Sequence, residues 1–247
     1  MGRTSPGQDS PLNRIRWRGI LALIPALVWS QPFRVGENLH YTAQFNFIPA
    51  GWATLQVLEM DTVHQQPTYH VYFQARTGKI ADRVYKIRDQ IHTWIHYQEY
   101  YTHRQQKIIR EGSYRKNSTT DIDYQRAIAV TGTDTFRISQ PLRDVYSLFY
   151  YLRTIPLELD SILQFTAFDN NRETPFRLRI SKRETVSVPA GSFTCIKVNP
   201  FREKRSLFKN QGDIEIWFSD DETRIPVQIQ IHLKYGSMLL QLDSYTL

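Results

Sequence analysis

The sequence predicts a mainly β protein, an antiparallel sandwich or barrel that carries one short helix. After residue 30, apolar and polar residues alternate in successive segments, with the period of a half-buried strand. These segments are rich in β-branched and aromatic residues, and they recur about every 8–12 residues between Gly, Pro, Asn and Asp turn signals. Residues 144–154 depart from this alternation.

Six or seven strands are expected before the helix and about six after it. In residues 39–47, Leu39, Tyr41 and Phe45 fall on one face of the expected strand. The Pro-Ala-Gly tripeptide at 49–51 predicts a turn, and so does the same tripeptide at 189–191. The other expected strands are residues 52–58, 69–75, 84–94, 108–114, 118–124 and 127–131, then 162–168, 176–188, 193–198, 212–218, 226–234 and 237–242.

Residues 144–154 predict a helix of about three turns. Asp144 can cap its first turn, and Pro156 ends the helical pattern two residues after Thr154. The residues at helical spacing are Val145, Leu148, Phe149 and Leu152. This apolar stripe is expected to pack across the sheet.

The first 30 residues have the three-part layout of a secretory signal peptide. A basic stretch that ends in Arg14, Arg16 and Arg18 precedes the apolar block 19–29, and Ser30 supplies a small residue at the cut. The block is too short to cross the roughly 30 Å hydrocarbon core of a bilayer as a helix. We therefore expect residues 1–30 to be a signal peptide and residues 31–247 to be a single β-rich domain. The protein is expected to be exported to the periplasm or cell envelope, with no transmembrane helix after cleavage.

The composition restricts the partners and the chemistry. Loss of residues 1–30 would lower the formal charge from +7 to about +4, and the remaining charges of both signs are interspersed. This pattern argues against nucleic-acid binding. Cys195 is the single cysteine, so no intrachain disulfide can form, and its apolar neighbours predict a buried side chain and not a reactive thiol. No cysteine directly follows the apolar block, which argues against a lipoprotein anchor.

The sequence contains no assembled catalytic, metal or cofactor motif, and none of these sites is predicted. There is no Gly-x-Ser-x-Gly nucleophile elbow. On a strand, His92 and His96 would lie about 13 Å apart, too far to share one zinc ion. The acidic run at 220–222 lies between two expected strands, as solvated turns commonly do.

Arg153 and several aromatic residues are the candidates for ligand binding. Arg153 ends the expected helix, and two interpretations stay open: a cation favoured near a helix C-terminus, or an arginine that holds an anion at the mouth of a β-cavity. The aromatic candidates are Tyr85 and Trp94 on the expected strand 84–94, Trp217 on 212–218, and Tyr72 on 69–75. They either fill the core or, in an open barrel, line a groove for lipid or sugar.

Several segments together resemble one family of exported bacterial proteins. They are residues 33–41 (FRVGENLHY), 48–53 (IPAGWA), 144–153 ending in YYLR, 188–193 (VPAGSF), and 216–221 (IWFSDD) followed by 224–227 (RIPV). In this order they are similar to the family catalogued as domain of unknown function 3108. The resemblance implies an envelope protein with a curved antiparallel sheet or open β-barrel and one short helix packed across it. It implies no activity and no catalytic residues.

These observations favour a non-enzymatic envelope protein that binds an amphipathic or glycan ligand, or an envelope protein partner, on a curved β-scaffold. Two alternatives stay open. One is an envelope hydrolase acting on cell-wall or polysaccharide material, and the other is a scaffold that only interacts with other proteins. An open apolar surface would favour binding, converging carboxylates would favour an enzyme, and a filled barrel would favour a scaffold.

The export prediction is tested by N-terminal sequencing of the protein purified from its native envelope. The mature chain is expected to begin at or near Gln31, because the apolar block ends just before Ser30. An intact Met1 or Gly2 terminus on protein from the cytosol would contradict the prediction.

Overall fold

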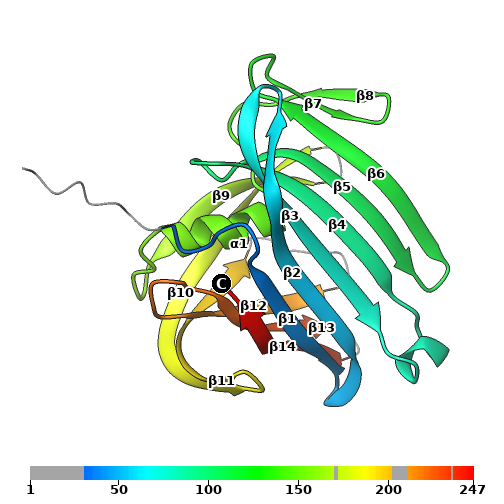
Figure 1. Cartoon of the computed structure of the whole chain (residues 1–247), viewed down its shortest axis with the longest axis vertical. Coiled ribbons are helices and arrows are strands. Elements are labelled where there is room, and N and C mark those ends of the chain that lie inside the picture. The colour runs from blue at the N-terminus through cyan, green and yellow to red at the C-terminus, as the bar shows by residue number, and fades with distance from the viewer. Residues whose placement is uncertain (1–30, 170–171, 202–210, 235) are drawn as a thin grey trace, which may run out of the picture. The chain divides into compact units, whose positions relative to one another are not determined.

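The described residues form one antiparallel sheet of 14 strands, with a short helix against one face (Figure 1). The structure is a computed structural model that describes residues 31–169, 172–201, 211–234 and 236–247. The predicted signal peptide, residues 1–30, lies outside them. The strands are β1 (Asn38–Phe45), β2 (Ile48–Val63), β3 (Gln66–Thr77), β4 (Arg88–His96), β5 (Thr102–Glu111), β6 (Tyr114–Asp123), β7 (Ile128–Thr131), β8 (Asp134–Arg137), β9 (Ile162–Asp169), β10 (Arg172–Val188), β11 (Gly191–Phe201), β12 (Gln211–Ser219), β13 (Pro226–Leu233) and β14 (Gly236–Thr246).

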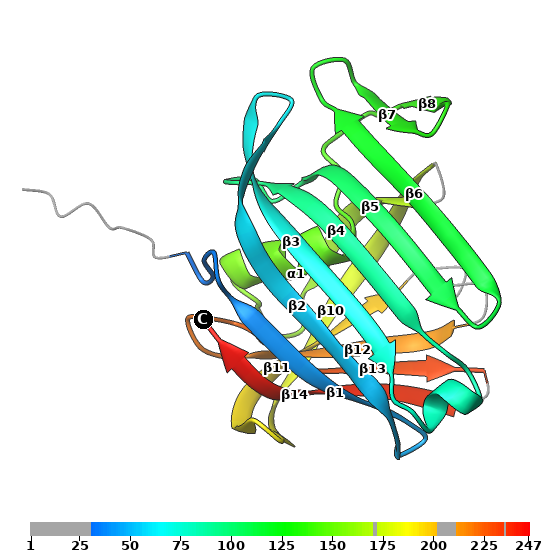
Figure 2. The same cartoon turned by 45° about the vertical axis from the view of Figure 1, so that its right-hand side comes forward.

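The order of the strands explains why the sheet is open. Each strand pairs with the next one along the chain, except that the chain leaves β8 at one edge, passes through α1 (Val145–Thr154) and returns as β9 at the other edge. The first strand, β1, pairs with the last, β14, which joins the two halves of the sheet. The sheet curves round α1 and stays open between β8 and β9 (Figure 2). The predicted curved antiparallel sheet or open β-barrel with one helix is therefore confirmed.

The two faces of the sheet differ in character. We call the face that α1 covers the inner face and the opposite face the outer face. In β1, Leu39 and Tyr41 are buried in the core beneath α1, whereas His40 and Thr42 alternate with them and are directed to the outer face. The same alternation in β2 buries Ala53, Leu55 and Val57 on the inner face. The core of the protein therefore lies between the inner face and the helix.

The helix forms where the sequence predicts it. The carboxylate of Asp144 accepts hydrogen bonds from the backbone N–H groups of Tyr146 and Ser147 at 2.7 and 3.0 Å, which caps the first turn. Leu148 and Leu152 are buried as expected, but Val145 is half exposed. No helix among the described residues is both long and apolar enough to cross a membrane.

Aromatic contacts fix α1 against strands from both halves of the sheet. Phe149 meets Phe218 of β12, and Tyr151 meets Phe165 of β9, at ring-centroid distances of 6.1 and 5.8 Å. The ring of Tyr146 lies 5.0 Å from that of Phe73 on β3. The helix therefore bridges strands that are far apart in the sheet order.

The prediction of a strand over residues 84–94 is wrong for its first residues. A short 3₁₀ helix, η1 (Ala81–Arg83), precedes an exposed loop, and β4 begins only at Arg88. The carboxylate of Asp82 accepts hydrogen bonds from Thr77 and Arg88, which holds this connection in a compact loop. The short strand β8, which was not predicted, lies at the sheet edge next to β7.

The turn predicted at residues 49–51 is also misplaced. The chain reverses at Asn46 and Phe47, both of which have positive φ. Gly51 lies inside β2, where a Cβ atom would collide with the backbone of Arg76 on β3. Close strand packing, and not a turn, therefore requires this glycine. The second tripeptide does form a turn, and Gly191 there has a φ of 135°.

A buried ion pair anchors the end of the helix. The guanidinium group of Arg153 donates hydrogen bonds to both carboxylate oxygens of Glu37, at 2.7 and 2.6 Å. It also donates to the carbonyl oxygens of Thr223 (2.9 Å) and Pro32 (2.7 Å), and the hydroxyl of Tyr150 donates to Glu37. The side chains of Arg153 and Glu37 are 1% and 0% exposed. Each charge is therefore satisfied inside the protein, as a buried bidentate pair requires.

Removal of one partner of this pair is expected to destabilise the fold strongly. Arg153→Ala leaves the Glu37 carboxylate buried without its cation, so the free energy of unfolding should fall by about 3–5 kcal/mol. Arg104→Ala is the matched control, since Arg104 pairs with Asp121 at the surface and its loss should cost about 0–1 kcal/mol. Urea unfolding of the two variants measures both values. Equal losses would show that the Glu37–Arg153 pair is not the anchor described.

Candidate functional site

The four predicted ligand residues lie in four different surroundings. Arg153 is in the buried ion pair, with its donors directed to protein acceptors. Tyr85 is half exposed in the loop before β4. Trp94 is on the outer face of β4, and Trp217 is buried on β12, where its N–H donates to Glu184 at 2.7 Å. Arg153 is therefore neither a simple helix-terminal cation nor an arginine at a cavity mouth. Its guanidinium group is buried and paired with Glu37, which comes from a distant part of the chain.

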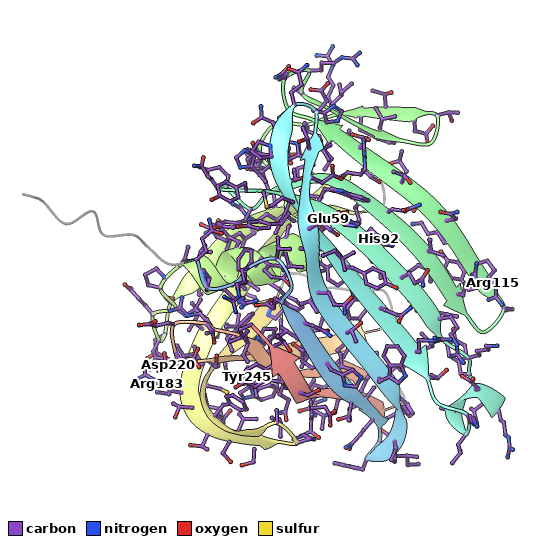
Figure 3. The ribbon with its side chains drawn as sticks, in the orientation of Figure 1. Glu59, His92, Arg115, Arg183, Asp220 and Tyr245 are labelled. Atoms are coloured by element: carbon purple, nitrogen blue, oxygen red, sulfur yellow. The ribbon has the colours of Figure 1, made fainter. Side chains whose placement is uncertain are left out.

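Trp94 belongs to a row of stacked side chains on the outer face. The ring of His70 lies 4.4 Å from that of Trp94 with an interplanar angle of 9°, and the Trp94 N–H donates to Asp61 at 2.8 Å. His70 also approaches His92 (Nε2 to Nδ1, 2.9 Å) and Glu59 (3.2 Å). Figure 3 labels Glu59 and His92 on this side of the sheet. Such a row of side chains stabilises a broad exposed sheet face.

Contacts within the protein occupy the histidine side chains of this region. Burial, together with nearby His70, lowers the pKa of His92, which favours its neutral form. His96 uses Nδ1 to accept the backbone N–H groups of Gln98 and Glu99, so it caps a turn. Among the described residues, no group of three or more His, Cys, Asp and Glu side chains is arranged to hold a metal ion.

The inner face also carries apolar side chains that the helix does not bury completely. Its half-buried side chains pack on the core yet keep part of their area exposed, which distinguishes them from the fully buried residues under α1. We call them the apolar inner surface: Phe73, Phe165, Phe176, Ile214, Ile231 and Leu240. They come from β3, β9, β10, β12, β13 and β14, and all of them pack against the same core.

The inner face of β4 and β5 also carries polar side chains among its buried apolar ones. Asp89 and Thr93 alternate with the outward residues of β4 and are buried, and Gln105 of β5 donates to Thr93. The carboxylate of Asp89 accepts the backbone N–H of Arg110 at 2.9 Å. Burial, and then the hydrogen bond and negative charge of Asp89, raise the pKa of Glu111 to about 7. Asp89 and Glu111 therefore form a carboxyl pair in which Glu111 keeps its proton up to about pH 7.

The sequence pattern did not lead us to expect a functional or structural role for these two carboxyl groups or for Glu37. A signal for Asp89 was present, because the two-residue period puts it on the same strand face as Ile91 and Ile95. An ionisable residue among buried apolar ones needs a partner. The sequence gives no indication that Glu111 is that partner, because strand register sets their distance.

Comparisons with known proteins identify a family and a fold. A family model described as a protein of unknown function, DUF3108, matches residues 40–243. No curated protein matches the sequence. A solved structure of a beta-barrel-like protein of domain of unknown function 1849 from Brucella abortus has 11% identity and a TM-score of 0.52, covering 85% of this chain and 96% of that chain. This likeness supports the fold alone.

Two further solved structures are similar at lower scores. One is a predicted exported protein with a YmcC-like fold from Bacteroides fragilis (11% identity, TM-score 0.38, 87% of this chain and 98% of that chain). The other is a predicted lipoprotein from Parabacteroides distasonis (11% identity, TM-score 0.38, 86% and 96%). The match to the family model spans most of the chain, in agreement with the resemblance noted in the sequence. The chain therefore belongs to DUF3108, a family of proteins of unknown function.

Proposed function

We propose that the protein is a non-enzymatic binding protein of the cell envelope that holds an amphipathic ligand against its inner face. The observation that carries this proposal is the apolar inner surface, which the helix leaves partly exposed. The ligand class is an acyl chain with a polar head group. The chain would lie on the apolar inner surface, and the head group would face the polar side chains of β4 and β5.

The energetics support an acyl chain as the apolar part. Full burial of a Phe, Leu or Ile side chain that starts exposed is worth about 1.5–3 kcal/mol. Each residue of the apolar inner surface is already half buried, so each gains less, but six such side chains act together. Hydrogen-bonding groups that suit a head group, such as Gln105, lie on β5, two strands from β3 in the sheet order.

The outer face is less suited to a glycan. Sugar rings bind by covering an exposed aromatic face. The ring of Trp94 is stacked on His70, and the Arg104 guanidinium lies 5.7 Å from its centre. Trp52 likewise has His40 stacked beside it and Arg76 near its ring. These aromatic faces already have protein neighbours, which favours the inner face as the binding surface.

Export is part of the proposal and rests on the N-terminal sequence. The basic stretch, apolar block and Ser30 support secretion of the chain. An envelope location would bring the protein close to acyl-bearing molecules.

A hydrolase is the second candidate, and the Asp89–Glu111 pair is the observation that favours it. A carboxyl group with a pKa of about 7 is suited to general acid–base catalysis near neutral pH. If the protein hydrolyses envelope polysaccharide, Glu111→Gln should abolish that activity without unfolding the chain. Retained activity in this variant would remove the pair from the chemistry.

Lipid extraction and mass spectrometry of protein purified from its native envelope test the binding proposal. The wild type is expected to carry a molecule with an acyl chain, and Leu240→Asn should lose most of it. Leu239→Asn is the matched control, because Leu239 is the preceding residue of β14 and its side chain alternates to the outer face. Thermal unfolding checks that both variants fold. Absence of such a molecule from the wild type, or its full retention by folded Leu240→Asn, would contradict the proposal.

The carboxyl pair also predicts how stability depends on pH. The pKa of Glu111 is raised from 4.5 to about 7 by folding, so between these values the folded protein binds a proton that the unfolded chain does not. Stability from this group is therefore present at pH 4.5 and is lost as the pH rises through 7. Denaturant unfolding at several pH values should show this decline in the wild type and a flatter profile in Glu111→Gln. An unchanged profile in the variant would refute the assignment.

A further inference from the structure

Three neighbouring connections at one end of the sheet carry exposed apolar side chains. They are the turn between β1 and β2, the segment around η1, and the turn between β5 and β6, which lie along the lower right-hand edge in Figure 2. Phe47, Ile80 and Val84 are 88%, 78% and 89% exposed. Ile48, Tyr85 and Tyr114 are also exposed. Large side chains as exposed as these mark a contact surface when they gather in one place.

Backbone contacts hold these connections together. The N–H of Gly78 donates to the carbonyl of Ala50 (2.8 Å), and the N–H of Gly112 donates to the carbonyl of Lys86 (2.8 Å). The ring of Tyr85 lies directly over Gly112, where a Cβ atom would come within 2.7 Å of it. The apolar side chains therefore project from a packed part of the fold, and we call this part the loop end.

Cations surround the apolar side chains of the loop end. Lys79, Arg83 and Lys86 are exposed in the η1 segment, and Arg115 is exposed at the turn between β5 and β6 (Figure 3). The acidic residue of the η1 segment, Asp82, is already paired with Arg88, which lies in β4. Glu111, at the end of β5, is protonated below about pH 7. The loop end therefore offers positive charge next to exposed apolar groups.

We propose that the loop end docks the protein on a lipid surface that contains anionic phospholipids. Phe47, Ile80 and Val84 would insert among the acyl chains, and the cations would contact the head groups. Tyrosines such as Tyr85 and Tyr114 suit the boundary between the two layers. Single apolar side chains on separate turns match a fluid bilayer better than the flat, continuous surface of a protein partner. This proposal goes beyond the ligand proposal and does not depend on it.

Vesicle flotation of the mature protein tests the docking. Vesicles of phosphatidylcholine with one quarter phosphatidylglycerol should bind the protein, and vesicles of phosphatidylcholine alone should bind it at least about ten-fold more weakly. Phe47→Ser combined with Val84→Ser should weaken binding to the anionic vesicles about ten-fold or more. Leu159→Ser is the matched control, because Leu159 is exposed but precedes β9 at the helix end of the sheet.

A labelled cysteine supplies a second measurement. Cys195 is fully buried, so a polarity-sensitive dye should react with Phe47→Cys or Leu159→Cys at the new residue. The dye at residue 47 should shift to the blue on anionic vesicles, and the dye at residue 159 should not. The proposal is overturned if the wild type fails to bind anionic vesicles, or if the double serine variant binds as well as the wild type. Either result would favour a protein partner at the loop end instead. Lipid retention on the inner face is measured separately, so either proposal can fail alone.

Discussion

The buried pair between Glu37 and Arg153 is the interaction on which the arrangement of helix and sheet depends. Glu37 directly precedes β1, Arg153 lies in the last turn of α1, and the same guanidinium donates to Thr223 in the connection before β13. One side chain therefore ties the helix to strands from both halves of the sheet. Burial of two charges is costly, so the pair tolerates only the geometry in which every donor and acceptor is satisfied. This requirement fixes where the helix ends and how it lies on the inner face.

The position of α1 divides the inner face into two parts. Beneath the helix, Leu39 and Phe218 are fully buried against it, and so is Leu152 on the helix itself. Around it, the curved sheet continues without a second α-helix among the described residues, and several of its apolar side chains stay only half buried. The helix lies at the end where β1 begins, and the exposed loop end is where β1 finishes. A ligand surface on the inner face and a lipid contact at the loop end would therefore share one side of the molecule.

Local pattern was enough to predict the helix and most of the strands, because alternation and capping depend on neighbouring residues. It missed β8, and the expected strand 108–114 runs through the turn between β5 and β6. Asp144 caps α1 and Leu152 is buried, as the pattern indicates. The surroundings of Arg153 were not predictable in this way, because its partner, Glu37, is brought near only by the pairing of distant strands. The prediction of a strand at residues 84–87 was wrong for a related reason. The side chain of Asp82 binds Arg88 and Thr77, and these contacts hold residues 84–87 in a loop despite their strand-like composition. Trp94 was predicted as a ligand residue from its type alone, and its stacking on His70 depends on register.

The open edge between β8 and β9 is stable because the connection between β8 and α1 replaces the missing strand pairing. The N–H of Arg143 donates to the carbonyl of Thr166 on β9, and the carbonyl of Leu142 accepts the N–H of Thr102 on β5. Gln140 adds a side-chain hydrogen bond to Thr166. An unpaired sheet edge invites association with other chains, and such contacts reduce that risk. The sheet can therefore stay curved but unclosed, and part of its apolar inner surface stays exposed.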